Sequence, residues 1–94
     1  MLYYGFIFAG EVYEKQLDTK IFKMKVAGVA DLEDAIGVAK KMVEEGVHLI
    51  ELCGDFGPVW AGKIIEAIDN KIPLGFVTYG AEAMEGLSNL PSGE

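Results

Sequence analysis

Residues 47–58 read VHLIELCGDFGP, and this stretch decides the fold. Its first six residues are nearly all apolar, which is typical of a short buried strand. The glycines and the aspartate that follow predict a tight turn. Pro58 then favours the start of a helix, because the N–H group that proline lacks has no helical partner at that position anyway. The stretch therefore predicts a strand, a turn and a helix in immediate succession.

Helices and strands alternate outward from this stretch. A helix is expected over 31–45, with Asp31 as its N-cap and Gly46 as the residue that ends it. A second helix is expected over 58–70, and each helix places its apolar residues on one face. Strands are expected at 2–9, 21–29, 47–52 and 72–79.

This order of elements predicts an α/β fold. The chain is expected to be one small domain with a four-stranded, mostly parallel sheet, a βαβαβ core and helices packed on it. Three layers and an open two-layer form both remain possible architectures. Residues 2–9 form the most apolar strand, which is expected inside the sheet and covered on both faces. Lys23 and Lys25 alternate with apolar residues, which favours an edge position for the first half of the strand 21–29.

The direction of the first strand is left open. Residues 10–20 are polar and are expected to be irregular, with at most one short helical turn. Eleven residues are few for a helical crossover, so an antiparallel start is the alternative to a parallel one. At the other end, the single domain 1–94 is expected to finish in a loosely ordered tail over 80–94 that contains one helical turn.

Composition excludes several classes of function. The chain has 94 residues, 15 acidic residues, eight basic residues that are all lysine, and a net charge of -7. Nucleic acid and anionic membranes are therefore not expected as partners. No apolar run approaches the roughly 20 residues of a membrane helix. One cysteine excludes a disulfide scaffold, and the run 1–9 is interpreted as a strand and not a signal peptide, so a cytoplasmic location is expected.

A functional site is expected at the carboxyl ends of the strands, where open α/β sheets bind ligands. Cys53 and Glu51 are the candidate catalytic pair, since they share a strand face and the thiol precedes a helix. The alternative is that Cys53 only fills space and that Glu51 reaches solvent or pairs with a lysine. The candidate ligand-binding residues are Gly54, Asp55, Phe56, Gly57, Trp60 and Tyr79.

The turn is a weak candidate for binding an anion. Asp55 opposes a phosphate, Pro58 removes one donor and arginine is absent, although the helix start could otherwise bind one. His48 is the only histidine and lies at the opposite end of its strand, where a structural or rim position is expected. No metal site is expected, because one histidine and one cysteine with scattered acids match no known ligand spacing. No cofactor is expected either.

The segment 35–79 resembles a family of small bacterial and archaeal α/β proteins known only as a domain of unknown function. The similarity rests on AKKMVEEGV, on ELCGDFG at 51–57 and on IPLGFV at 72–77. The resemblance implies that the Glu-Leu-Cys-Gly-x-Phe-Gly turn acts as a unit, but it brings no activity. A weaker similarity to part of the class I keto-sugar-acid aldolases matches Glu51 to a strand-end glutamate. That likeness is interpreted as shared βαβ geometry, because the strand 72–79 contains no lysine for a Schiff base.

Three functions are compatible with these patterns. The first is a small-ligand-binding protein that acts as a homo-oligomer, since the core is thin and the second helix has a wide apolar stripe. Its ligand would be a small polar metabolite. The second is an isomerase, lyase or thiol-dependent enzyme that uses Cys53 and Glu51, with Tyr79 positioning the substrate. The third is a structural or regulatory interaction module.

Overall fold

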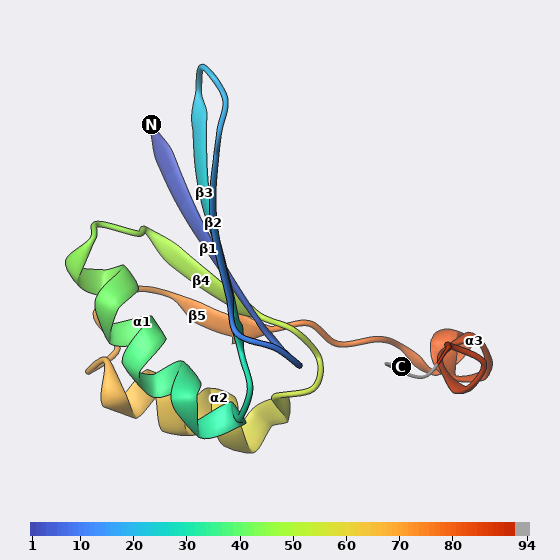
Figure 1. Ribbon diagram of the computed structural model, residues 1–94. Helices are drawn as coiled ribbons and strands as arrows, with labels where there is room; N and C mark the ends of the chain where they lie inside the picture. Colours follow the sequence, from blue (N-terminus) through green and yellow to red (C-terminus); the bar gives the residue numbers. More distant parts are fainter. Residues whose placement is uncertain (92–94) are drawn as a thin grey trace.

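The computed structural model describes residues 1–91 and contains one five-stranded sheet and three α-helices (Figure 1). Short 3₁₀ turns at Leu32–Asp34 and Ala81–Ala83 precede α1 and α3. The elements, in chain order, are β1 Leu2–Ala9, β2 Tyr13–Asp18, β3 Phe22–Val29, α1 Ala35–Glu44, β4 Leu49–Leu52, α2 Gly57–Ala67, β5 Leu74–Phe76 and α3 Met84–Ser88.

The sheet has the strand order β2-β3-β1-β4-β5, which places β1 at its centre. β1 is parallel to β3 and to β4, and β5 is parallel to β4. The predicted single α/β domain with a mostly parallel sheet is therefore confirmed. The open question of the first strand is also answered, since β1 runs parallel to both of its neighbours.

The stretch between β1 and β3 contains a strand, and the expectation of an irregular connection there is wrong. β2 pairs antiparallel with β3 as a hairpin, so the sheet has five strands and not four. Tyr13 and Leu17 share one face of β2 with Lys15 between them, and every residue of β2 is exposed. A strand this polar carries almost no hydrophobic signal.

The hairpin also changes the place of β3. The two lysines of β3 had predicted an edge strand, but β2 occupies the edge and β3 lies inside the sheet. The side chains of Lys23 and Lys25 point to the side of the helices. Lys23 lies over the ring of Tyr3, 4.5 Å from its centroid, and Lys25 contacts Glu14 and Glu45. Local partners on that side, and not an edge position, account for the alternating lysines.

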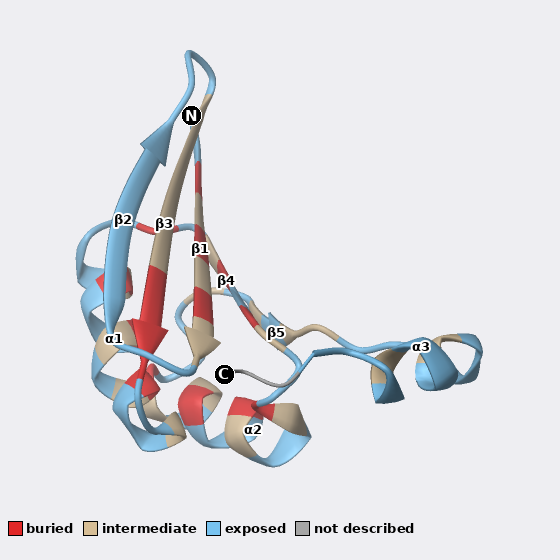
Figure 2. Cartoon of the chain, turned by 45° about the vertical axis from the view of Figure 1, so that its right-hand side comes forward, coloured by how far each residue is buried: buried red, intermediate tan, exposed pale blue. Residues whose placement is uncertain are grey.

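Both long helices cover one face of the sheet, as Figures 1 and 2 show. The chain moves from β3 to β4 and from β4 to β5 in the same direction, so two right-handed crossovers place α1 and α2 on the same side. The core lies between these layers, and its largest fully buried side chains are Ile7, Met42, Ile50, Leu52 and Ile64. The architecture is thus the open two-layer form of the two that the sequence allowed.

The opposite face of the sheet is open in the single chain. Alternation along β1 points Tyr3, Gly5 and Ile7 to the helices, whereas Tyr4 and Phe6 point away from them and are only half-buried. The expectation that residues 2–9 are covered on both faces is therefore wrong for one copy of the chain. Figure 2 shows the resulting alternation of buried and partly exposed positions along β1.

The helix boundaries follow the predicted signals closely. The backbone N–H of Asp31 donates a hydrogen bond to the carboxylate of Asp34, 3.3 Å away, which supports the predicted start of the first helical segment. Gly46 has a φ of +89°, as expected for the glycine that ends a helix. α2 ends three residues earlier than predicted, and Asp69 and Asn70 then adopt the left-handed backbone conformation.

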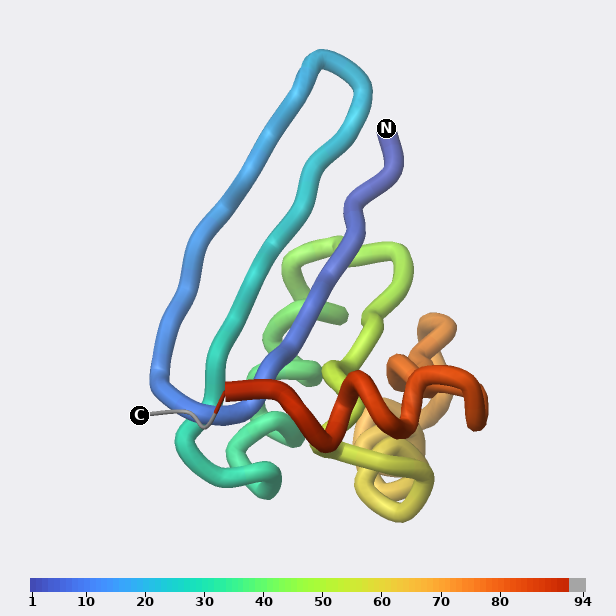
Figure 3. Tube along the Cα trace, turned by 90° about the vertical axis from the view of Figure 1, so that its right-hand side faces the viewer, coloured from blue at the N-terminus to red at the C-terminus, as the bar shows by residue number. Residues whose placement is uncertain are grey.

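The C-terminal segment, residues 80–91, leaves β5 on the side of the sheet opposite α1 and α2 (Figures 1 and 3). It contains the short helical structure that the sequence predicted. That residues 80–94 form a loosely ordered tail stays a prediction, and residues 92–94 lie outside the described part of the chain. Within residues 1–91 no helix is long and apolar enough to cross a membrane.

Candidate functional site

The turn after β4 is fixed by backbone hydrogen bonds at the carboxyl end of the sheet. The N–H of Cys53 donates to the carbonyl of Ile7 on β1, with 3.0 Å between nitrogen and oxygen. The N–H of Phe56 donates to the carbonyl of Cys53 at 3.2 Å and closes the turn. The N–H of Val77 donates to the carbonyl of Leu52 at 2.9 Å, which holds the chain after β5 beside the turn.

A cavity of about 400 Å³ lies where these segments meet. One wall is the turn with the start of α2, and the other is the segment after β5 together with α3. Its lining residues are Gly54, Asp55, Gly57, Pro58, Phe76, Val77, Thr78, Tyr79, Met84 and Leu87. The volume falls within the roughly 300–1,000 Å³ of small-molecule sites.

Two glycines of the turn shape the cavity wall. A Cβ on Gly54 would lie 3.3 Å from the carbonyl oxygen of Val77, a tight contact that would require the two segments to move slightly apart. Gly57 has a φ of +65°, which a residue with a side chain adopts only with strain. These backbone requirements account for the glycines without any contact to a ligand.

The lining combines apolar surface with a few polar groups. Phe76, Met84 and Leu87 supply hydrophobic contact area, and Tyr79 supplies a hydroxyl group that can donate or accept a hydrogen bond. Asp55 is the acidic residue of the lining, and the lining has no basic side chain. The electrostatics of the cavity therefore favour neutral or cationic groups over anions.

The predicted ligand-binding residues divide into two groups. Gly54, Asp55, Gly57 and Tyr79 all line the cavity. The other two lie outside the lining. Phe56 is buried in the core and Trp60 packs against that core, with the ammonium of Lys63 4.3 Å from the centroid of its ring. Their binding roles, like those of the lining residues, stay predictions.

Cys53 and Glu51 also lie outside the lining of the cavity. The side chain of Cys53 is half-buried against the core. Glu51 is exposed on the open face of the sheet, where its carboxylate accepts a hydrogen bond from the hydroxyl of Tyr4 on β1. Burial first, and then this hydrogen bond and the charge of Glu51, raise the pKa of Tyr4 from 10.0 to about 12. Among the described residues, the hydrogen-bond partner of Glu51 is thus a tyrosine.

Sequence reasoning identified Tyr79 but missed the part of the second wall that α3 forms. Met84 and Leu87 belong to the segment that was expected to be a loose tail. The signal was present, because two apolar residues three positions apart lie on one face of a helical turn. One short apolar pair did not outweigh the polar and glycine-rich composition around it.

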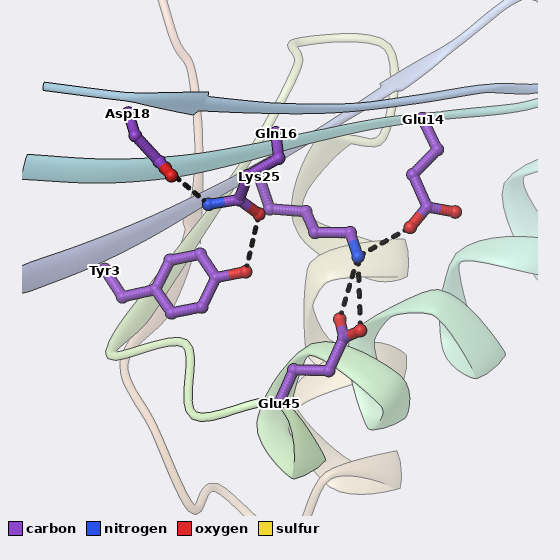
Figure 4. A network of polar contacts seen from close by, with 6 residues as sticks. All are labelled: Tyr3, Glu14, Gln16, Asp18, Lys25 and Glu45. Carbon is purple, nitrogen blue, oxygen red and sulfur yellow. Dashed lines mark hydrogen bonds and ion pairs between the residues drawn. The ribbon is translucent and has the colours of Figure 1, made fainter.

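A second hollow, of about 450 Å³, lies between the β2–β3 hairpin and α1. Lys25 spans it, and its ammonium lies 2.5 Å from the carboxylate of Glu14 on β2 and 3.1 Å from that of Glu45 after α1 (Figure 4). The bond to Glu14 is the main cause that raises the pKa of Lys25, and Lys25 in turn lowers the pKa of Glu14. These three side chains tie the hairpin to the helix layer.

A neighbouring set of polar contacts extends this connection. The hydroxyl of Tyr3 donates to the side-chain oxygen of Gln16 at 2.8 Å, and the amide of Gln16 donates to Asp18 at 2.7 Å (Figure 4). The polar groups of Tyr3, Gln16 and Asp18 are thus hydrogen-bonded to one another, and this cluster has a structural role. His48 is structural as well, since its Nδ1 accepts a hydrogen bond of 2.8 Å from the backbone N–H of Tyr3.

Groups of acidic, histidine and cysteine side chains that could hold a metal ion are absent from residues 1–91. A comparison with protein families gives one match, to the family described as "Family of unknown function (DUF6506)", over residues 2–92. No curated protein and no solved structure matches the chain. Because the match covers nearly the whole sequence, the chain belongs to the DUF6506 family of unknown function.

Proposed function

We propose that the protein binds a small neutral or cationic molecule in the cavity at the carboxyl ends of β4 and β5. The observation that carries this proposal is the cavity itself, about 400 Å³ in volume and lined by the turn after β4, the segment after β5 and α3. Its position agrees with the general rule for open α/β sheets. Its size and mixed lining agree with sites that bind small molecules.

The lining supports a particular class of ligand. An aliphatic or aromatic body of the ligand would contact Phe76 at the end of β5 and Met84 and Leu87 on α3. A hydrogen-bonding group would reach the hydroxyl of Tyr79 or Thr78. A positive charge would be stabilised by Asp55, whereas a carboxylate or phosphate would be repelled by it.

The thiol-enzyme alternative has less support. It needs Cys53 and Glu51 within about 2.6–3.2 Å of each other or joined by one water. Glu51 is engaged by Tyr4, and neither Glu51 nor Cys53 lines the cavity. The binding proposal therefore assigns Cys53 to packing and Glu51 to the open face of the sheet.

Size-matched probes of different charge test the proposal. Indole, tryptamine and indole-3-acetate share one ring system and are neutral, cationic and anionic, and they belong in a wider fragment set screened by ligand-observed NMR. We expect neutral and cationic fragments to bind in the high-micromolar to millimolar range, with tryptamine ahead of indole-3-acetate. Preference for the anionic probes, or no binding by any fragment of the set, would overturn the proposal.

A matched pair of variants assigns the binding to the cavity. Leu87→Asp places a charge in the lining, whereas Leu90→Asp places the same charge at an exposed position outside it. We expect at least a tenfold loss of fragment affinity in the first variant and little change in the second. Equal effects of the two substitutions would contradict the assigned site.

A further inference from the structure

The open face of the sheet is an apolar surface that the helix layer leaves uncovered, and the C-terminal segment 80–91 leaves the sheet on this side. Alternation and register put ten apolar or aromatic side chains on it, and most of them are only half-buried. They are Leu2, Tyr4, Phe6, Phe8, Tyr13, Leu17, Phe22, Met24, Val26 and Leu49. A contiguous apolar surface of this size marks an interaction site.

The side chains of this face are ordered by contacts among themselves. The rings of Phe8 and Tyr13 lie 6.0 Å apart, and those of Tyr4 and Phe22 lie 6.1 Å apart. The ring of Phe8 lies over Gly28, where a Cβ would come within 2.5 Å of it. The aromatic side chains of the face are thus packed against one another and against the backbone of β3.

Two charged side chains lie on this face among the residues of the five strands, Lys15 and Glu51. The strand pairings put both in one row across the sheet, in which Lys15 pairs with Val26, Val26 with Phe6, Phe6 with Glu51, and Glu51 with Gly75. Phe6, on the central strand, is the middle of this row. The positive charge lies two strands to one side of it, and the negative charge lies one strand to the other.

We propose that a second copy of this chain covers the open face, related to the first by a two-fold axis that runs along β1. Such an axis reverses the order of the row, so β1 packs on β1 and β2 packs on β5. Lys15 then lies opposite Gly75 of the partner subunit and one strand away from Glu51 of the partner subunit. A two-fold axis across the strands would place Lys15 against Lys15 instead, so the charges select the axis along β1.

The surface opposite Lys15 has room for that side chain. A hollow of about 330 Å³ lies over β4 and β5, and its lining includes both Glu51 and Gly75. Gly75 has no side chain, so a lysine that approaches from a facing sheet meets open space there. The same hollow contains the carboxylate that neutralises it.

The area of the face is sufficient for a stable dimer. Five strands spaced about 4.8 Å apart, with eight residues in β1, give a flat area on the order of 400–500 Å² per copy. Side chains make the accessible area larger than the flat one. Two copies therefore reach the roughly 1,000 Å² that separates specific interfaces from incidental contacts. Sheets that pack face to face in this way are a common architecture.

The oligomeric state and two substitutions test the proposal. Sedimentation equilibrium is expected to give a dimer at micromolar concentration, and a monomer would overturn the inference. Phe6→Lys at the centre of the face is expected to weaken the dimer at least a hundredfold. Val59→Lys is the control, because Val59 is 68% exposed on α2 at the other side of the molecule. A dimer that survives Phe6→Lys but dissociates in the control would place the interface elsewhere.

Milder variants keep the test valid where Phe6→Lys does not fold. Leu2 and Leu17 lie on the same face and are 46% and 44% exposed, so lysine at either position leaves the core intact. Each is expected to raise the dissociation constant at least tenfold. Wild-type dissociation constants for both would overturn the proposed surface.

Charge exchange tests the direction of the axis. Lys15→Glu and Glu51→Lys are each expected to weaken the dimer about three- to fivefold, in the range of exposed ion pairs. The double variant is expected to return to within about twofold of the wild type. Additive weakening in the double variant would overturn the axis along β1.

A cross-link tests the pairing of β1 with β1. Facing sheets lie about 10 Å apart, which is within the span of a short bis-maleimide but too far for a disulfide. Phe6→Cys in a Cys53→Ser background is expected to cross-link between copies, and Val59→Cys in the same background is not. The reverse pattern would overturn the arrangement. These readouts are independent of the cavity, so the ligand proposal and the dimer proposal fail separately.

Discussion

The hydroxyl of Tyr4 donates a hydrogen bond to the carboxylate of Glu51 across the boundary between β1 and β4. The pair lies on the open face of the sheet, and Glu51 belongs to the row that carries Lys15. Burial, the hydrogen bond and the negative charge of Glu51 all favour the protonated phenol, which raises the pKa of Tyr4 to about 12. The carboxylate of Glu51 on β4 thus has its hydrogen-bond partner on β1, and a catalytic role beside Cys53 stays a prediction.

Glu51→Gln is expected to lower the pKa of Tyr4 but not to return it to 10.0. The substitution removes the charge and weakens the hydrogen bond, whereas burial, the largest of the three causes, remains. Because the folded protein holds this proton more tightly, the contribution to stability is present below pH 10 and is lost as the pH rises toward 12. Tyrosine-selective ¹³C NMR across this range measures the shift, and an unchanged pKa in the variant would contradict it.

Gly5→Ala is expected to destabilise the protein by about 1–2 kcal/mol. The added Cβ would lie 2.9 Å from the sulfur of Met42 and 3.0 Å from a methyl group of Val47, between the sheet and α1. The flexible methionine keeps the cost at the lower end of the range for overpacked cores.

Gly37→Ala is the control and is expected to stabilise the protein. Gly37 lies in α1, a Cβ there would meet no atom within 4 Å, and alanine is the better helix former by about 0.5–1 kcal/mol. Urea unfolding of both variants measures the contrast. A stabilising Gly5→Ala would show that α1 does not pack this closely on β1.

Lys25→Met is expected to lower stability near neutral pH, because it leaves Glu14 and Glu45 without their shared cation. The raised pKa of Lys25 means that its contribution is lost as the pH rises through that value. The lowered pKa of Glu14 means that its contribution is lost as the pH falls through the acidic range. In the variant, stability should therefore depend less on pH on both the acidic and the alkaline side of the profile. Thermal unfolding at a series of pH values measures this dependence.

The matched control for this variant is Lys40→Met, since Lys40 is exposed on α1 and belongs to no ion pair among the described residues. Its pH profile of stability is expected to follow the wild type. A flattened profile in the control as well would assign the effect to net charge and not to the Lys25 cluster.

Cys53→Ala is expected to cost stability by about 1 kcal/mol and to leave fragment binding unchanged. The side chain is half-buried against the core and does not line the cavity. Alkylation of the native thiol is expected to be much slower than that of the urea-unfolded chain. Fast native alkylation, or loss of binding in Cys53→Ala, would restore Cys53 as a functional group.

Much of the architecture could be predicted from the sequence, because the residues of β4, the turn and α2 carry strong local signals. Pro58, Gly46 and the capping residue Asp31 each mark an element boundary through their own backbone chemistry. The apolar stripe of the second helix was correctly predicted, and its part in subunit contacts stays a prediction. In the structure Ala61 and Ile64 use that stripe to cover the chain's own sheet.

The remaining features depend on tertiary pairing. β2 is a fully exposed strand, so its existence depends on the partner strand β3 and not on buried apolar residues. Alternation of Phe22, Met24 and Val26 did reveal an apolar face of β3. The order of the strands in the sheet determines which face the helices cover, and local patterns do not give that order. The open face therefore could not be predicted from local patterns, and the apolar pair of Met84 and Leu87 was too short a signal to predict the wall of the cavity.

The most direct test of the central claim is a protein-observed NMR titration with the strongest-binding neutral or cationic fragment. Ligand binding at the strand ends predicts saturable shifts of the amides of Gly54, Thr78, Tyr79 and Leu87, from both walls of the cavity. Saturable shifts confined to the hollow around Lys25, or to the open face of the sheet, would contradict the assignment of the cavity as the binding site.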